Sequence, residues 1–203
     1  MPLTPVETTL LRLSVAVVLG DWPTLRQLRR SAGPGQPNLA WREAVLQSHL
    51  FAGFPRLVEA YGVLESEGGL GTPGPEQRRA EGDQPERGGE LFRLIYAEQA
   101  PAVRATLERF HPDYADWILG HAYGRVLCRP GLEPQTRELL AVACLAALGQ
   151  DRQLASHVRG ALHCGADAET LFEVLDATAD LIEEPHRRRT RRVLESFATS
   201  RGA

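Results

Sequence analysis

The chain has 203 residues, of which 43% are hydrophobic and 24% are charged, as in an ordinary soluble globular protein. This length can bury the core of one domain or of two small ones. The formal net charge of -3 excludes a global positive field that would recruit nucleic acid or an anionic membrane, and no apolar run approaches the roughly 18 residues of a membrane span.

Capping residues and apolar periodicity predict four helices in the first third of the chain. Thr4, Pro5 and Glu7 combine an N-cap, a proline at the first helical position and a capping-box glutamate. The apolar run that follows stops at Gly20, and Asp21 can cap the next helix. We expect helices over 5–19, 22–32, 39–52 and 55–66.

The composition changes abruptly over residues 67–89. This stretch holds seven glycines and three prolines with scattered charges, which predicts a flexible linker. Helical patterns resume afterwards, at about 90–108, 112–127, 134–148, 151–164, 168–182 and 185–199. Because strand signals are almost absent, the predicted fold class is all-α.

The two ends of the chain match one another when the sequence is shifted by 129 residues. Pro5 then falls on Pro134 and Gly20 on Gly149, and further matches follow after a one-residue gap. They lie at helix caps, helix ends and helix faces, where a shared fold constrains the residue type, so we predict two related helical units. The predicted divisions are a first, degenerate unit at 1–66, the linker at 67–89 and a second unit at 90–203.

The second unit carries an ordered set of short motifs over residues 112–182. In chain order they are Tyr123-Gly124-Arg125-Val126-Leu127, Leu132-Glu133-Pro134, Arg137-Glu138-Leu139-Leu140, His157-Val158-x-x-Ala161-Leu162, Gly165 and Glu173-Val174-Leu175. By the order and spacing of this set, the chain resembles the carboxymuconolactone decarboxylase family, which is similar in turn to alkylhydroperoxidase D. The resemblance implies an alkylhydroperoxidase D-like helical bundle that assembles into trimers or larger rings. Because three duplicated chains would present six units, we expect a homo-oligomer, a trimer that mimics a hexamer of single units.

The resemblance also implies two catalytic residues, Glu138 and His157, which stand at positions that match the family. In the peroxidase branch a Cys-x-x-Cys pair lies between them, whereas this chain has Gln150 and Gln153 there. Glutamine has no ionisable thiol and cannot cycle through a disulfide, so the peroxidase chemistry is expected to be missing. The decarboxylase-like branch is therefore the closer one.

The positions of Glu138 and His157 allow an acid–base pair. They fall on consecutive helices, at levels about five residues or 8 Å apart along the axis, so a direct contact requires extended rotamers or a bridging water. A glutamate next to a histidine suits the transfer of a proton to or from the carbon that loses carbon dioxide. The alternative is a buried hydrogen bond that only ties two helices together. Because Thr9 and Leu28 replace the pair in the first unit, at most one site per chain is expected.

Two arginines are candidates for substrate binding. Arg137 and Arg125 can each clamp the carboxylate of a small anionic substrate through paired hydrogen bonds. The alternative for each of them is a solvated position on the surface of a helix.

The three cysteines, Cys128, Cys144 and Cys164, are odd in number and widely spaced, which argues against a disulfide framework and against a zinc site. Cys144 lies in a stretch that is apolar on every face, and Cys164 lies near a helix C-terminus, where the helix dipole disfavours a thiolate. We expect no metal and no cofactor. The first residues, MPLTPVETT, lack the basic and apolar regions of a signal peptide, so a reduced, cytoplasmic setting is expected.

The stretch 186–192 is the dense basic run of the sequence. It has no interleaved aromatic residues and the chain is net acidic, so we expect neither nucleic acid nor a membrane as a partner. A solvated helix face or a contact between subunits is the favoured interpretation. The nearby acidic residues Glu183, Glu184 and Glu195 are the expected partners for ion pairs.

Three functions remain open from the sequence. The first is a cofactor-free, decarboxylase-like lyase that acts on a small carboxylated lactone or a related acid through Glu138 and His157. The second is an alkylhydroperoxidase-like peroxidase, which is disfavoured because it would need Cys144 or Cys164 to act alone. The third is a non-catalytic helical oligomer of the same family, which a structure without a cavity at Glu138 and His157 would favour.

Overall fold

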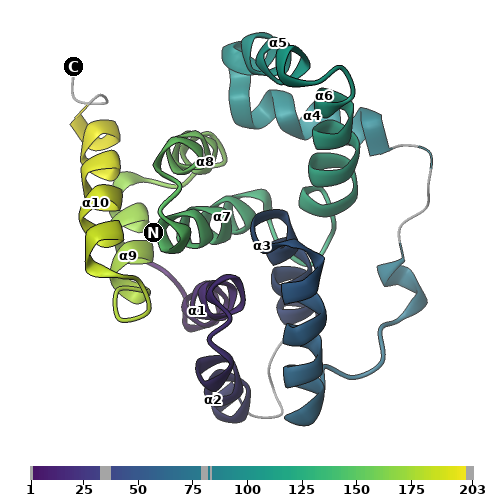
Figure 1. Ribbon diagram of the computed structural model, residues 1–203, viewed down its shortest axis with the longest axis vertical. Coiled ribbons are helices and arrows are strands. Elements are labelled where there is room, and N and C mark those ends of the chain that lie inside the picture. Colours follow the sequence, from purple (N-terminus) through teal and green to yellow (C-terminus); the bar gives the residue numbers. More distant parts are fainter. Residues whose placement is uncertain (1, 33–37, 79–81, 83, 200–203) are drawn as a thin grey trace.

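The computed structural model describes residues 2–32, 38–78, 82 and 84–199, and all regular secondary structure within these ranges is helical (Figure 1). This confirms the predicted all-α class. The α-helices are α1 (Pro5–Leu19), α2 (Trp22–Ala32), α3 (Asn38–Ser66), α4 (Gln84–Tyr96), α5 (Ala100–Phe110), α6 (Tyr114–Trp117), α7 (Pro134–Leu148), α8 (Asp151–His163), α9 (Ala168–Ala177) and α10 (Glu184–Thr199). Two 3₁₀ turns, η1 (Pro75–Gln77) and η2 (Ala97–Gln99), and a π-helix, η3 (Ile118–Leu127), lie between them. No helix in the described part of the chain has both the length and the apolar character that crossing a membrane requires.

The first two helices begin at the caps that the sequence predicts. The hydroxyl of Thr4 accepts a hydrogen bond from the backbone N–H of Glu7 at 3.2 Å, and the backbone N–H of Thr4 donates to the Glu7 carboxylate at 2.9 Å. Gly20 ends α1 in the left-handed conformation, with a φ of 72°. The carboxylate of Asp21 then accepts from the backbone N–H of Thr24 at 3.1 Å and caps α2.

The helices predicted over 39–52 and 55–66 form one element, α3, with a kink. The kink lies at Gly53, whose φ of 78° is outside the helical range, and Pro55 follows it without a backbone N–H. The chain therefore bends at the predicted gap, but the second helix continues directly from the first.

Three other predicted helices differ from the observed ones. The helix expected over 90–108 is divided into α4 and α5 near Ala97, which has a φ of 47° and interrupts the helical backbone. The helix expected over 112–127 consists of the short α6 and the π-helix η3. The helix expected over 168–182 ends at Ala177. Apolar periodicity locates each of these segments, but it does not resolve their internal breaks.

The predicted linker at 67–89 is described only in part, because residues 79–81 and 83 lie outside the described residues. Before them, η1 forms a single 3₁₀ turn. After them, α4 begins at Gln84, so the last six residues of the stretch are helical and not linker. Composition did not indicate this helix start.

Close packing between α4 and η3 explains a glycine in each of them, Gly88 in α4 and Gly124 in η3. A Cβ atom at Gly88 would overlap the carbonyl oxygen of Leu119, and one at Gly124 would overlap the carbonyl oxygen of Gln84. The two backbones therefore touch, which a residue with a side chain would prevent. A stretch whose composition suggests flexibility thus forms a tight contact between helices.

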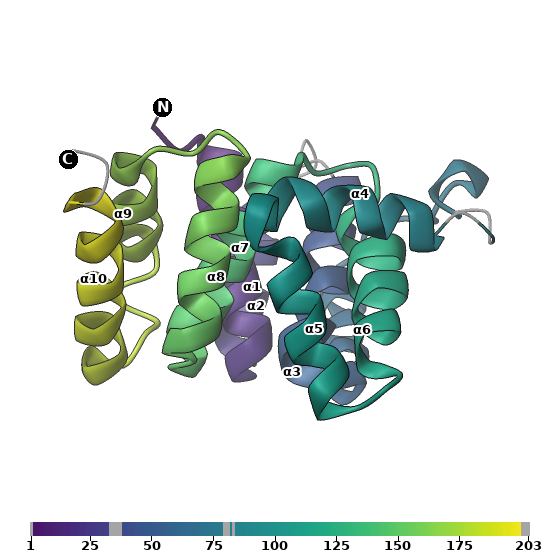
Figure 2. The ribbon, with the colours of Figure 1, turned by 90° about the horizontal axis from the view of Figure 1, so that it is seen from above.

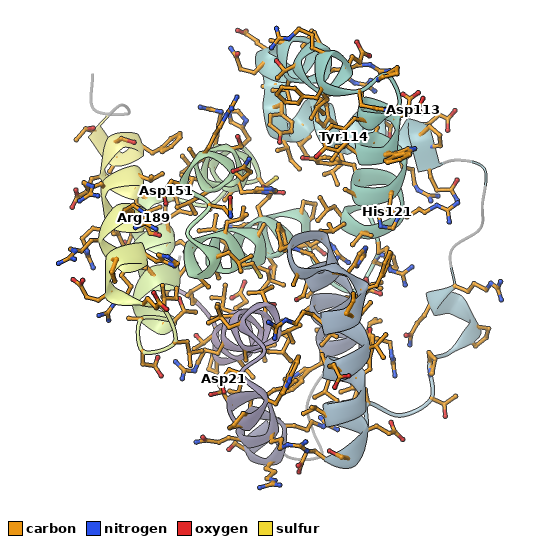
Figure 3. All side chains as sticks on the ribbon, in the orientation of Figure 1. Asp21, Asp113, Tyr114, His121, Asp151 and Arg189 are labelled. Carbon is orange, nitrogen blue, oxygen red and sulfur yellow. The ribbon has the colours of Figure 1, made fainter. Side chains whose placement is uncertain are left out.

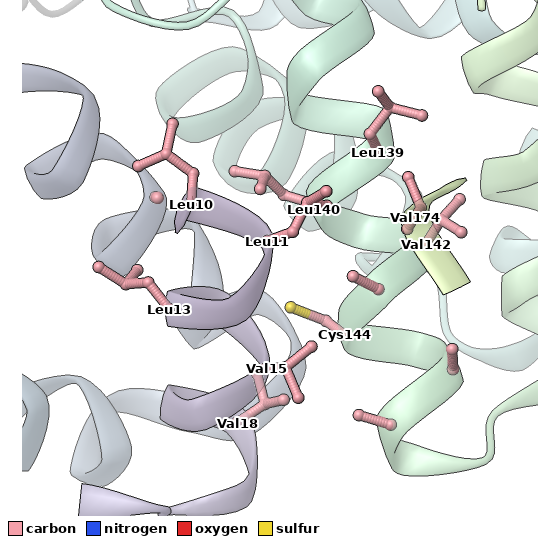
Figure 4. Close-up of a cluster of buried hydrophobic side chains, with 14 of the residues drawn as sticks. Leu10, Leu11, Leu13, Val15, Val18, Leu139, Leu140, Val142, Cys144 and Val174 are labelled. Carbon is pink, nitrogen blue, oxygen red and sulfur yellow. The ribbon is translucent and has the colours of Figure 1, made fainter. Parts of the chain in front are cut away.

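The helix α7 is the centre of the larger hydrophobic core. It lies between α1 and α8 (Figure 1), and 11 of its 15 residues are buried. Leu11 of α1 faces Leu140 of α7, and the Cys144 thiol points toward α1 (Figure 4). Side chains from both predicted units contribute to this one core.

A second, smaller cluster joins α4 to η3. It is built around Leu91, Phe92 and Ile95 of α4 and around Leu119 and Tyr123 of η3. Figure 2 shows α4, α5 and α6 on the side of α8 that faces away from α9 and α10. The candidate site lies where this cluster meets α7 and α8.

The basic run 186–192 lies on α10 and forms ion pairs within the chain. Arg188 contacts Glu184 at 3.0 Å, as the sequence suggested. Arg189 contacts Asp151 of α8 at 3.0 Å (Figure 3), which is a partner from a different helix that the sequence alone did not indicate. The run is thus a helix face with internal ion pairs, in which exposed pairs stabilise by about 0–1 kcal/mol each.

The helices that the predicted repeat superimposes have similar ends. Both α1 and α7 have 15 residues and begin with proline. Both end at a left-handed glycine, with a φ of 72° at Gly20 and of 66° at Gly149. This likeness concerns single helices, and duplication of the chain stays a prediction.

The packing of α4 on η3 predicts opposite effects for two neighbouring glycines. The Gly88→Ala substitution is expected to lower the free energy of unfolding by about 1–3 kcal/mol, because the new methyl group forces the helices apart. The Gly89→Ala control places its Cβ 3.6 Å from the end of Arg93, and it is expected to stabilise the helix by about 0.5–1 kcal/mol. Urea unfolding measures both, and equal effects would contradict the close contact.

Candidate active site

Two neighbouring charged residues of α7, Arg137 and Glu138, are buried, with 1% of each side chain exposed. Successive residues of an α-helix point about 100° apart, so the two side chains leave α7 in different directions. Arg137 points toward α3 and Glu138 toward α8. Because a buried charge costs several kcal/mol unless it is paired, each of them requires a partner.

Arg137 is held by a network on the α3 side. Its Nη2 atom lies 3.0 Å from Oε2 of Glu43 and donates to the backbone carbonyl of Arg129 at 2.9 Å. Glu43 in turn binds the guanidinium group of Arg129 at 2.8 Å. These contacts join α3, α7 and the segment that precedes α7.

Glu138 forms a direct hydrogen bond with His157 of α8. The Nδ1 atom of His157 lies 2.9 Å from Oε2 of Glu138. Because a carboxylate oxygen accepts, the Nδ1–H donates, and Nε2 is the ring nitrogen that remains to exchange a proton with a ligand. Gly160 makes this direct contact possible, since a Cβ atom there would overlap Oε2 of Glu138.

A cavity of about 520 Å³ lies beside this pair. Such a volume is within the range of about 300–1,000 Å³ that is typical of small-molecule sites. His157 lines the cavity together with Gln150 and Gln153, from the start of α8. Glu138 is not one of the described lining residues, so His157 is the member of the pair that can contact a ligand.

Two hydrogen-bonded tyrosines form another polar part of the wall. The hydroxyl of Tyr123 donates to the hydroxyl of Tyr96 at 3.2 Å. Burial raises the pKa of Tyr123 well above its usual value, and the nearby Tyr96 and Glu138 raise it further. Burial also raises the pKa of Tyr96, although the hydrogen bond from Tyr123 opposes this effect. Both side chains are therefore neutral phenols at physiological pH, and Tyr96 can donate its own proton to an oxygen of a ligand.

The sequence did not indicate a role for either tyrosine. Tyr123 belongs to one of the motifs that carry the family resemblance, but its side chain has no chemical signature in the sequence. Tyr96 lies at the end of α4, and it reaches the cavity only because α4 packs on η3.

Two of the three thiols, those of Cys144 and Cys164, lie in surroundings that disfavour the reactive thiolate. Cys144 is buried in the core, and burial raises the pKa of its thiol far above the usual range. Burial, together with the negative charge of Glu138, raises the pKa of Cys164 to about 11. Cys128 donates its S–H to the carbonyl of Gly124 at 3.0 Å. All three are free cysteines, and the thiolate form that reacts with peroxide is scarce at Cys144 and Cys164.

The two arginines predicted to bind substrate lie away from the cavity. Arg125 is exposed on η3, and Arg137 is buried against Glu43. Neither belongs to the cavity wall as far as the structure describes it. The structure therefore brings Glu138 and His157 together, and substrate binding by the two arginines stays a prediction.

The fold and the site define a class of protein, an all-helical bundle in which a buried carboxylate orients a histidine at a small-molecule cavity. Residues 112–196 match the model of the carboxymuconolactone decarboxylase family. The segment contains both Glu138 and His157, whereas α4 and α5 precede it.

Two proteins of known name are similar in sequence to this chain. The chain is 36% identical over 70 residues to the 4-carboxymuconolactone decarboxylase of Acinetobacter baylyi, a match that covers 34% of this chain and 52% of that protein. It is 28% identical over 148 residues to Peroxisomal protein 2 of Schizosaccharomyces pombe, which covers 70% of this chain and 68% of that protein. The match thus spans about half of the length of the decarboxylase.

The environment of Cys164 predicts slow reaction with thiol reagents. With a pKa of about 11 in place of 9.0, the thiolate fraction near pH 8 is about 100-fold lower than that of an ordinary cysteine. Alkylation by iodoacetamide, followed at Cys164 by peptide mass spectrometry, is expected to be slower by about this factor in the native protein than in urea. The native rate is expected to rise as the pH approaches 11. Equal native and unfolded rates at pH 8 would contradict the inert environment.

Proposed function

We propose that this protein is a cofactor-free enzyme in which His157, oriented by Glu138, transfers a proton during loss of carbon dioxide from a small carboxylated lactone or a related acid. The observation that carries the proposal is the 2.9 Å bond between Nδ1 of His157 and Oε2 of Glu138 in a histidine that lines a cavity. The match of residues 112–196 to the carboxymuconolactone decarboxylase family supports the reaction class.

The residues divide the reaction between them as follows. The bond between the α-carbon and the carboxylate breaks, carbon dioxide leaves, and the electron pair stays on the α-carbon as an enolate with the neighbouring carbonyl. Protonated His157 then delivers the proton on Nε2 to that carbon and regains one from water. Glu138 offsets the charge of the imidazolium group, and the Tyr96 hydroxyl donates to the enolate oxygen.

The two alternative functions receive less support. A thiol peroxidase needs a reactive thiolate, but Gln150 and Gln153 stand at the cavity, and the pKa of Cys164 is raised to about 11. A non-catalytic oligomer would be favoured by a pair without a cavity, but His157 lines one.

Assembly and location are part of the same proposal. The trimer of two-unit chains rests on the family resemblance and on the internal repeat, and the cytoplasmic location rests on the odd number and wide spacing of the cysteines. A monodisperse monomer in light scattering would contradict the trimer. Localisation of a tagged chain in an organelle would contradict the cytoplasmic location.

Removal of the imidazole predicts loss of turnover. The His157→Gln substitution is expected to lower kcat for release of carbon dioxide by about 10²–10⁴-fold, since the proton donor is absent. His163→Gln is the matched control, because His163 lies on the same helix but binds the carbonyl of Ile95 at 2.8 Å and is not one of the described lining residues.

Glu138→Gln separates orientation from charge, because the amide oxygen can still accept from Nδ1 but cannot offset an imidazolium charge. Its loss of kcat is expected to be smaller than that of His157→Gln. The assay follows the release of carbon dioxide from small carboxylated lactones and from keto acids. Full activity of His157→Gln would sink the proposal.

A further inference from the structure

The cavity wall is apolar over most of its area. Beyond His157, Gln150, Gln153 and the neutral hydroxyl groups of the tyrosines, it is formed by aliphatic and aromatic groups, such as those of Phe51 of α3 and Leu107 of α5. No arginine, lysine, aspartate or glutamate occurs among the lining residues in the described ranges of the chain. Only His157 can therefore supply a positive charge within this wall.

The negative charge of Glu138 further restricts the number of anionic groups that the cavity can bind. A protonated His157 and an ionised Glu138 together carry no net charge. The negative charge of Glu138 also reaches the cavity, because it adds to the effect of burial in raising the pKa of Tyr123. One carboxylate can bind against the imidazolium group and the amide N–H groups of Gln150 and Gln153. A second carboxylate would lose its water among apolar side chains without a counter-charge, which is strongly unfavourable.

The described guanidinium groups near this region do not line the cavity. Arg159 stacks on the ring of Phe197, although its charge reaches far enough to lower the pKa of Tyr96. Arg137 is bound to Glu43, and Arg125 is exposed on η3. Arg152 lines an adjoining surface hollow with Gln153, but the main cavity does not include it.

We infer that the cavity takes a monocarboxylated ketone or lactone with an apolar alkyl or ring body, and not a dicarboxylate. The inference rests on the proposed function, since the single carboxylate is the group that leaves as carbon dioxide at His157. The product is then uncharged and suits the apolar wall. The polar end of the ligand lies at His157, Gln150 and Gln153, and the apolar body lies against α3, α5 and η3.

Binding of uncharged product analogues tests the inference without turnover. Isothermal titration calorimetry would measure γ-lactones with alkyl chains of increasing length against the wild-type chain. Each added methylene group is expected to tighten binding by about fourfold while it is buried. A lactone dicarboxylate of similar size is expected to bind at least about tenfold more weakly than its alkyl monocarboxylate counterpart.

A positive charge placed in the apolar wall is expected to reverse the preference for an alkyl lactone over a dicarboxylate. Leu107→Arg is expected to weaken binding of the alkyl lactone by about tenfold or more and to strengthen binding of the dicarboxylate. Phe110→Arg adds the same charge on the same helix, but Phe110 lines only the outer hollow. Phe110→Arg and Arg152→Gln are both expected to leave the preference unchanged.

The outcomes separate this inference from the proposed function. A wild-type chain that binds the dicarboxylate as tightly as the monocarboxylate, or that binds none of the lactones, overturns the substrate class. The same holds if Arg152→Gln abolishes binding of the ligands, because the site would then be the outer hollow. If alkyl lactones bind with the expected dependence on chain length and the carboxylated forms are not turned over, the ligand class stands and the decarboxylase proposal fails.

Discussion

The structure depends on the burial of two adjacent, oppositely charged residues in its central helix. Because α7 is covered by other helices, Arg137 and Glu138 cannot reach water, and each is 1% exposed. An uncompensated charge in such a place costs several kcal/mol, so the neighbouring helices must supply partners at fixed positions. Glu43 of α3 pairs with Arg137, and His157 of α8 pairs with Glu138. The two pairs fix how α3 and α8 lie against α7.

The cavity follows from these two fixed helices and from the cluster of α4 and η3 that closes over them. Gly160 lets the Glu138 carboxylate reach α8, while Gly88 and Gly124 bring the α4 and η3 backbones into contact. One wall therefore carries His157 and its amide neighbours, and the others carry apolar and phenolic side chains. The same packing that stabilises the fold thus gives the site its polarity.

Much of the fold could be predicted from local signals, because caps and helix ends depend on residues close in sequence. Thr4, Glu7 and Asp21 are examples of such local caps. The start of α4 is the main exception, because its glycines are explained only by the close contact with η3. The pair of Glu138 and His157 came from the family resemblance, and helix levels alone allowed a direct contact only through extended rotamers, with a bridging water as the alternative.

Two features of the site could not be found in this way. Arg137 was interpreted as a substrate clamp or a surface residue, because it lies in the first turn of α7, before the stretch that is apolar on every face. Tyr96 has no local signal at all, since only the tertiary contact of α4 brings it to the cavity. Both depend on contacts between segments that are distant in the sequence.

The most direct test of the account is the protonation pattern of the His157 ring. Correlation spectra of the histidine side chains by ¹H–¹⁵N NMR, with His157 assigned through the spectrum of His157→Gln, report which nitrogen carries the proton in the neutral ring. The hydrogen bond to Glu138 predicts the Nδ1–H form, and the resonance of Nε2 is expected to change when a lactone enters the cavity. An Nε2–H form that does not respond to Glu138→Gln would contradict it.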